Sequence, residues 1–99
     1  SQSLNLQMDH EKKAYCLCDD ATYFSAKDKV DLEILVQGDA RLHNPYSVIC
    51  THPKTHPKVK YPEAMAFVGW LTGAEGQAII RDFEAGGQHL FVPDVFPSP

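Results

Sequence analysis

Four residues of this 99-residue chain have the types and spacing that could bind a metal ion. Cys16 and Cys18 form a C-x-C pair and His52 and His56 form an H-x-x-x-H pair, and zinc and copper are bound by such thiolates and imidazoles. The histidines belong to a repeated His-Pro loop, however, and not to a helix that would turn both toward one ion. We therefore assign no metal ligand, and a metal-binding or interaction module that uses these four residues is the alternative function.

A thiol nucleophile needs a base within reach and a feature that lowers the pKa of the thiol. Cys18 precedes an expected helix N-terminus, but the neighbouring carboxylates of Asp19 and Asp20 oppose formation of a thiolate. No glycine-rich phosphate loop is present either, since Gly86 and Gly87 follow an expected helix instead of preceding one. The sequence thus predicts no catalytic residue, no cofactor and no enzyme activity.

Anion binding by a helix N-terminus is the chemistry that remains. A strand, a tight turn and a helix over residues 17–24 would present backbone N–H groups and the positive end of a helix dipole, and Thr22 would add a hydroxyl. Asp19 has a second interpretation, because an aspartate in this position can accept a backbone hydrogen bond as the helix N-cap.

The elements that must position these residues form a mixed α/β pattern. A short helix is expected over residues 4–13, and another begins after Asp19 and Asp20. Strands are expected where apolar, β-branched or aromatic residues cluster between turn signals. These strands comprise residues 14–18, 32–37 and 46–50. The next segment, residues 51–58, contains two prolines that lack a backbone donor and is expected to be a surface loop.

The last third predicts two consecutive helices. Pro62 suits a first helical turn, and apolar residues then recur at the i, i+3, i+4 and i+7 spacing of one helix face. Thr72 and Glu75 have the spacing of a capping box, which predicts a second helix, and Gly86-Gly87 is expected to end it. A short extended piece at residues 90–93 and a proline-rich, non-helical tail at residues 94–99 follow.

Composition and charge exclude several classes of protein. The chain is 43% hydrophobic and 22% charged, as in ordinary globular domains, and its net charge is −4 with dispersed positive residues. This argues against nucleic-acid or anionic membrane surfaces as partners. No apolar stretch reaches the roughly 20 residues that span a bilayer. The first residues resemble neither a signal peptide nor an initiator sequence, so we expect a processed or truncated end.

Six stretches of the chain carry a resemblance to a known family, and they are residues 31–39, 41–42, 44–46, 56–57, 70–77 and 90–94. They closely resemble the C-terminal part of the tungstate-binding proteins of ABC transporters. The region around residues 70–77 is typical of the whole superfamily of type II periplasmic binding proteins, whereas residues 31–46 are much more specific. The resemblance covers nearly the whole chain.

The resemblance implies part of a two-lobed α/β receptor of the type II periplasmic-binding-protein fold. Residues 1–43 would belong to the second lobe, residues 44–51 would cross back, and residues 52–99 would hold the C-terminal helices that pack on the first lobe. Such receptors are periplasmic or extracellular, bind a tetrahedral oxyanion such as tungstate or molybdate, and deliver it to an ABC permease. The expected partner is therefore the missing N-terminal part of the receptor, or a second copy of the chain.

The resemblance also suggests which residues contact the ligand. Asp19, Thr22 and Tyr23 agree with the family, whereas the family has threonines at the positions of Cys16 and Cys18, and an arginine at the position of Asp20. Neutral hydrogen-bond donors bind such dianions in a dry cleft, so the local candidates are Thr22, Cys18 and the backbone at Asp19. Two oxyanion motifs of the family would precede Ser1.

The apolar faces of the two C-terminal helices, around Phe67 and Ile79, would then be shaped to pack against a lobe that these residues do not include. In isolation we expect the chain to cover them by self-association, by exchange of segments or by retaining a partner.

Overall fold

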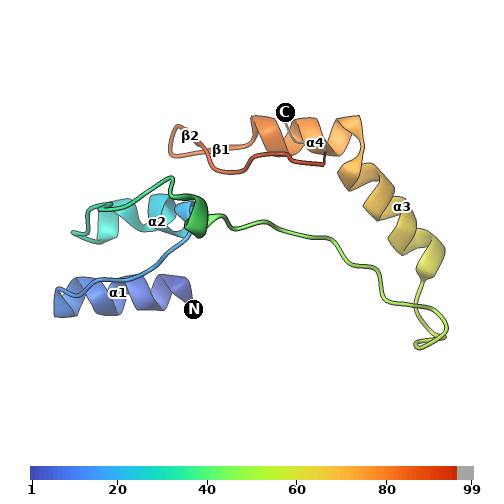
Figure 1. The fold of residues 1–99 in the computed structure, drawn as a ribbon, viewed down its shortest axis with the longest axis horizontal. Coiled ribbons are helices and arrows are strands. Elements are labelled where there is room, and N and C mark those ends of the chain that lie inside the picture. The colour runs from blue at the N-terminus through green and yellow to red at the C-terminus, as the bar shows by residue number, and fades with distance from the viewer. Residues whose placement is uncertain (96–99) are drawn as a thin grey trace. The chain divides into compact units, whose positions relative to one another are not determined.

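The structure is a computed structural model that describes residues 1–95, and it divides into two compact units (Figure 1). One unit comprises residues 1–45 and 84–90, and the other comprises residues 46–83 and the chain from Phe91 onward. Each unit is described by itself. Together they contain helices and one pair of short strands, which is compatible with an α/β fragment. Of the predicted tail, residues 96–99 lie outside the described residues.

Helix α1 (Gln2–Lys12) confirms the short helix expected near the N-terminus. Ser1 caps its start, since the Ser1 hydroxyl accepts the N–H of Leu4 at 3.2 Å. The helix ends at Lys13, which adopts the left-handed conformation with φ 54° and donates its N–H to the carbonyls of Asp9 and His10.

Helix α2 (Asp20–Ala26) begins where the two aspartates predicted it. The Asp19 carboxylate accepts the N–H of Thr22 at 2.7 Å and is the N-cap. A 3-10 helix, η1 (Lys27–Lys29), continues from α2, and a second one, η2 (Ala40–Leu42), follows the turn at Gly38.

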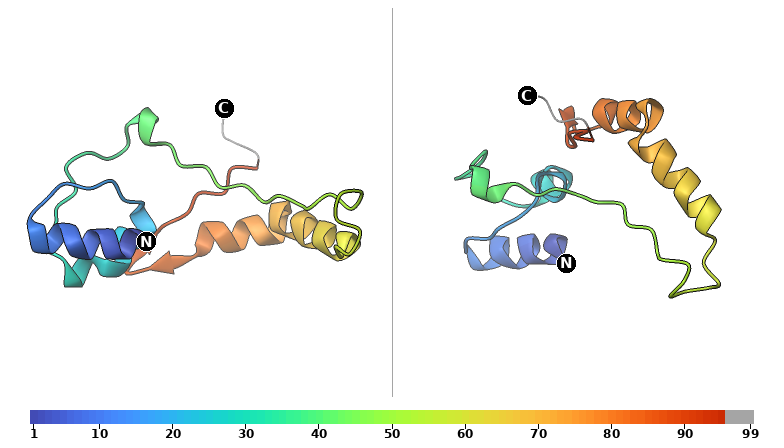
Figure 2. Two further views of the ribbon diagram at one scale, coloured as in Figure 1. Left: turned by 90° about the horizontal axis from the view of Figure 1, so that it is seen from below. Right: turned by 45° about the vertical axis from the view of Figure 1, so that its right-hand side comes forward.

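Long-range side-chain hydrogen bonds hold α1 beside α2 (Figure 2). The Gln2 amide oxygen accepts the N–H of Asp19 at 2.8 Å, and Nδ1 of His10 accepts the N–H of Asp31 at the same distance. Leu6 of α1 is only 2% exposed, and it is the one fully buried apolar side chain among residues 1–95. The core of this unit is therefore very small.

The three predicted strands do not form. Residues 14–18, 32–37 and 46–50 are extended but belong to no strand in the described part of the chain. The reason is physical, because a strand exists only when a neighbour pairs with its backbone groups, and no such backbone pairing is formed by these segments among residues 1–95.

The strand pair that the structure does contain is a hairpin of β1 (Glu84–Ala85) and β2 (Gln88–His89), in which Glu84 pairs with His89 and Ala85 with Gln88. Gly86 and Gly87 form its turn with φ of 59° and 76°, values that favour glycine at both positions. The prediction that these glycines end a helix was wrong, because the helix ends at Asp82.

Helices α3 (Tyr61–Thr72) and α4 (Ala74–Asp82) confirm the two helices predicted in the last third, and Pro62 lies in the first turn of α3. The predicted capping box was wrong. The Thr72 hydroxyl donates to the carbonyl of Val68 at 2.8 Å inside α3, so it does not cap α4, which begins after Gly73 without a side-chain cap.

Close backbone approach joins α3 to α4 at the bend visible in Figure 1. A Cβ atom on Gly76 would collide with the carbonyl oxygen of Trp70 and lie 2.8 Å from the Cα of Leu71. The Gln77 amide also donates to the Leu71 carbonyl at 2.9 Å. Gly76 is therefore required by the helix joint itself.

We expect Gly76→Ala to destabilise the joint by about 1–3 kcal/mol, since the added methyl group would force the two backbones apart. Gly69→Ala is the matched control, because nothing lies within 4 Å of a Cβ at this position of α3 and alanine favours a helix interior by about 0.5–1 kcal/mol. Denaturant unfolding followed by fluorescence of Trp70, the chain's single tryptophan, measures both effects. Equal stability of the two variants would contradict the proposed role of Gly76.

Candidate functional site

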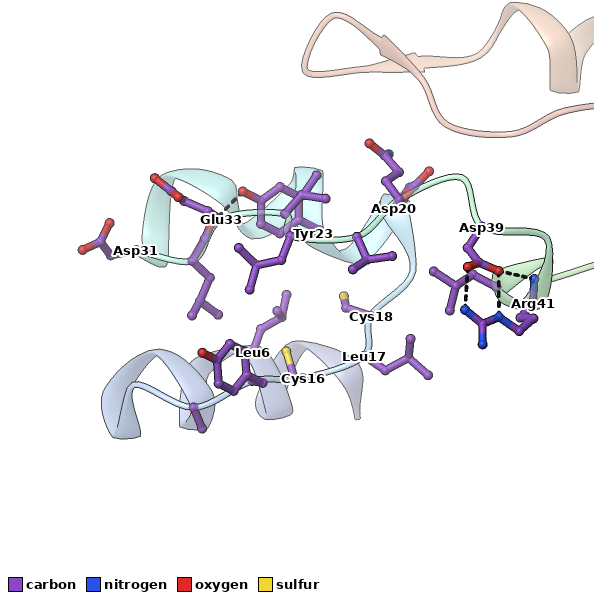
Figure 3. A pocket seen from close by; sticks show the side chains of 18 residues that line it. Leu6, Cys16, Leu17, Cys18, Asp20, Tyr23, Asp31, Glu33, Asp39 and Arg41 are labelled. Atoms are coloured by element: carbon purple, nitrogen blue, oxygen red, sulfur yellow. Dashed lines mark hydrogen bonds and ion pairs between the residues drawn. The ribbon is translucent and has the colours of Figure 1, made fainter.

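The first unit contains a pocket of about 900 Å³. Leu6, Cys16, Cys18 and Tyr23 lie around the space between α1 and α2 (Figure 3). The extended residues 14–18 and 31–37 supply most of the remaining lining, and the Tyr23 hydroxyl donates to the Leu32 carbonyl at 2.8 Å and so holds the second of these segments near α2. Most of the lining side chains are apolar.

The charged side chains of the pocket are mostly negative. Asp20, Asp31, Glu33 and Asp39 line it together with one cation, Arg41. The Arg41 guanidinium is already paired, because its Nη2 lies 2.8 Å and its Nε 3.1 Å from the two carboxylate oxygens of Asp39. Hydrogen bonds from Arg41 lower the pKa of Asp39, and those to Asp39 raise the pKa of Arg41. This pocket is therefore a poor match for a dianion.

The three predicted ligand residues surround the start of α2, but they do not share one cavity. Cys18 lines the pocket, whereas Asp19 and Thr22 lie outside its lining. The Asp19 carboxylate accepts the N–H of Thr22, the N–H of Asp19 is donated to Gln2, and the Cys18 thiol donates to the Asp19 carbonyl at 3.2 Å. Asp19 thus has the capping role that was one of its two interpretations, and an oxyanion role for the three residues remains a prediction.

The cysteines are all free thiols. A hydrogen bond to the Asp9 carboxylate and partial burial raise the pKa of Cys16, while burial and the nearby charge of Asp19 raise the pKa of Cys18. Both changes disfavour the thiolate that nucleophilic or metal chemistry would use.

The alternative metal site lacks a ligand cluster in the described chain. Within residues 1–95 no three histidine, cysteine, aspartate or glutamate side chains lie close enough to hold an ion. His52 instead stabilises its own turn, since its Nδ1 accepts the N–H of Lys54 at 3.1 Å.

The sequence did not predict the long-range hydrogen bonds that hold the parts of this unit together. The bonds from Gln2 to Asp19 and from His10 to Asp31 join residues 17 and 21 positions apart, and no local pattern signals such pairs. The Asp39–Arg41 pair could have been found from its opposite charges two residues apart, next to the turn at Gly38.

Comparison with known proteins identifies the class of protein to which the chain is similar. Over 86 residues, or 82% of the chain, it is 45% identical to a Haloferax volcanii protein named as an ABC transporter anion-binding protein. Two further relatives are named tungstate-binding protein TupA. The chain is 38% identical to the one from Campylobacter jejuni over 91% of its length, and 34% identical to the one from Peptoclostridium acidaminophilum over 90%.

The chain is therefore homologous, over most of its length, to anion-binding and tungstate-binding proteins of ABC transporters, which confirms the resemblance found in the sequence. It spans between a quarter and about a third of these relatives, since the matched regions are 25%, 35% and 32% of their lengths. No protein-family model and no solved structure matches the chain. No helix among residues 1–95 is long and apolar enough to cross a membrane.

We expect Asp9→Asn to increase the rate at which Cys16 is alkylated at neutral pH. The raised pKa of Cys16 depends first on its hydrogen bond to the Asp9 carboxylate, so replacing that carboxylate with an amide lowers this pKa and increases the thiolate fraction. Peptide mass spectrometry after timed iodoacetamide labelling measures the rate at each cysteine.

Asp28→Asn is the matched control, because it removes the same charge from an exposed position of η1 that is absent from the causes of either raised cysteine pKa. An equal increase of Cys16 labelling in both variants would show that net charge, and not the Asp9 contact, controls the thiol.

Proposed function

We propose that the chain is part of an extracytoplasmic solute-binding protein that binds a tetrahedral oxyanion of the tungstate or molybdate type and delivers it to an ABC permease. The observation that carries this proposal is the similarity to three named anion- or tungstate-binding proteins over 82–91% of the chain. The function is binding without catalysis. The location of the natural protein would be the periplasm or the cell exterior.

The fold that goes with this function is the two-lobed type II arrangement. In it, residues 1–43 contribute to the second lobe, residues 44–51 cross between the lobes, and residues 52–99 pack on the first lobe. The helical content of both units and the extended, apolar character of residues 46–50 are compatible with these roles.

The proposed local contribution to ligand binding comes from Thr22, Cys18 and the backbone at Asp19. A dianion removed from water needs a hydrogen bond to each of its oxygens. The Asp19 carboxylate already accepts the backbone N–H of Thr22, so the Thr22 hydroxyl is the most suitable donor of the set. The negative charge of Asp20, also in the first turn of α2, requires that the other donors come from elsewhere in the natural protein.

The natural protein that contains these residues is expected to bind tungstate or molybdate with measurable heat in a calorimetric titration, and to bind sulfate more weakly. The 99 residues alone are expected to give no heat, because the donors from the rest of the protein are missing. Heat from none of the three anions with the natural protein would refute the proposed ligand class.

Thr22→Val in the natural protein is expected to weaken oxyanion binding about 10- to 100-fold, since a hydrogen bond to a charged group contributes about 1.5–3 kcal/mol. Thr55→Val makes the same change at an exposed loop position in the other unit and serves as the control. Unchanged affinity in Thr22→Val would remove Thr22 from the site while leaving the ligand class intact.

A further inference from the structure

Two segments of the first unit have the composition of buried strands but none of their pairing. Residues 14–18 and 31–37 are extended, and no backbone-to-backbone hydrogen bond involves residues 15–18 or 31–37 within the described chain. In folded proteins nearly all buried backbone donors and acceptors are paired. Side chains of the same unit satisfy two of the backbone groups in these segments, since the Asp31 N–H is donated to His10 and the Leu32 carbonyl accepts from Tyr23. The other backbone groups of residues 15–18 and 31–37 are left for water or another chain segment to satisfy.

The side chains of the two segments make exposure to water unfavourable. Tyr15 is 88% exposed and Leu17 79%, and Leu35 and Val36 are each 68% exposed. Consecutive apolar residues in extended chain point to opposite faces, so a segment such as residues 34–36 would be buried on both faces in a finished sheet. Water can satisfy these backbone groups, but it leaves the apolar side chains exposed, so a neighbouring strand would be the more favourable partner.

The pocket lies where a neighbour would fit. Both segments line the same space of about 900 Å³, and its lining is mostly apolar. Figure 3 shows α1 and α2 bordering it. An extended polypeptide entering this space could pair with one or both segments through backbone hydrogen bonds and bury its apolar side chains against Leu6 and Tyr23.

The length of the relatives identifies the occupant. The region shared with this chain is 25–35% of each relative, so most of each relative lies outside it. We infer that the pocket between residues 14–18 and 31–37 receives at least one β-strand from polypeptide equivalent to that outside portion, and that this strand completes a sheet on which α1 and α2 pack. The inference depends on the homology but not on the proposed oxyanion ligand.

Fragment complementation tests the inference. The isotope-labelled 99-residue chain is mixed with the Campylobacter jejuni relative from which the 94 matched residues have been removed, in buffer without tungstate. The two pieces are expected to co-elute as a one-to-one complex. Amide exchange at residues 15–18 and 33–37 is expected to slow by at least about 100-fold, because paired strands open only at a substantial cost in free energy.

A matched pair of variants distinguishes binding in the pocket from nonspecific association. Leu17→Asp puts a charge on the pocket lining and is expected to abolish the complex. Leu4→Asp makes the same change on α1, at a leucine that is 57% exposed and outside both pocket linings, and is expected to leave the complex intact. Helical circular dichroism of each unmixed variant shows whether its helices still form.

Three results would overturn the inference. The first is no complex at all, and the second is a complex in which residues 15–18 and 33–37 remain unprotected. The third is protection of these amides by the 99-residue chain alone, rising with concentration together with a dimer mass, which would make a second copy the occupant. Tungstate is added only afterwards, so a complex that forms but binds no tungstate would refute the ligand proposal and leave this inference standing.

Discussion

An extended segment can be buried in a protein only where a neighbouring strand satisfies its backbone hydrogen bonds, and this requirement separates the elements that form here from those that do not. Helices satisfy the same groups within themselves, and α1, α2, α3 and α4 all form. The segments that need a neighbour stay unpaired, and in consequence Leu6 is the one fully buried apolar side chain among residues 1–95. The pocket is lined by two of these unpaired segments, residues 14–18 and 31–37.

The same division explains how much of the fold could be predicted from the sequence. The helices follow from local information, such as the capping position of Asp19, the first-turn Pro62 and the recurring apolar residues after it. The strands were recognised as extended segments, but their pairing depends on distant polypeptide and no local pattern contains it. Two local signals also failed: the Thr72 hydroxyl bonds back to Val68, and Gly86-Gly87 turns a hairpin.

The sequence predicted the residue types of the candidate site but not the hydrogen bonds that join residues far apart in the chain. Asp19 was recognised as a cap candidate because N-capping is local, whereas its bond to Gln2 is not. The Cys18 thiol was recognised as a poor nucleophile from the nearby acids Asp19 and Asp20, whereas no such prediction was made for Cys16. The dominant acid at Cys16 proves to be Asp9 of α1, which the turn of the chain at Lys13 brings near.

The start of α2 shows how a structural cap and an anion site compete for the same groups. The first backbone donors of a helix attract any negative group, and here the Asp19 carboxylate takes that of Thr22 while Gln2 takes the N–H of Asp19. A tetrahedral oxyanion at this turn would be repelled by the capping carboxylate. In the proposed site the Thr22 hydroxyl is therefore a better donor than the N–H of Asp19, which is already donated to Gln2, and most of the other donors would come from polypeptide beyond these residues. Because the strands that complete the sheet and the donors that complete the ligand site would both come from that polypeptide, folding of this unit and binding by the natural protein would be coupled.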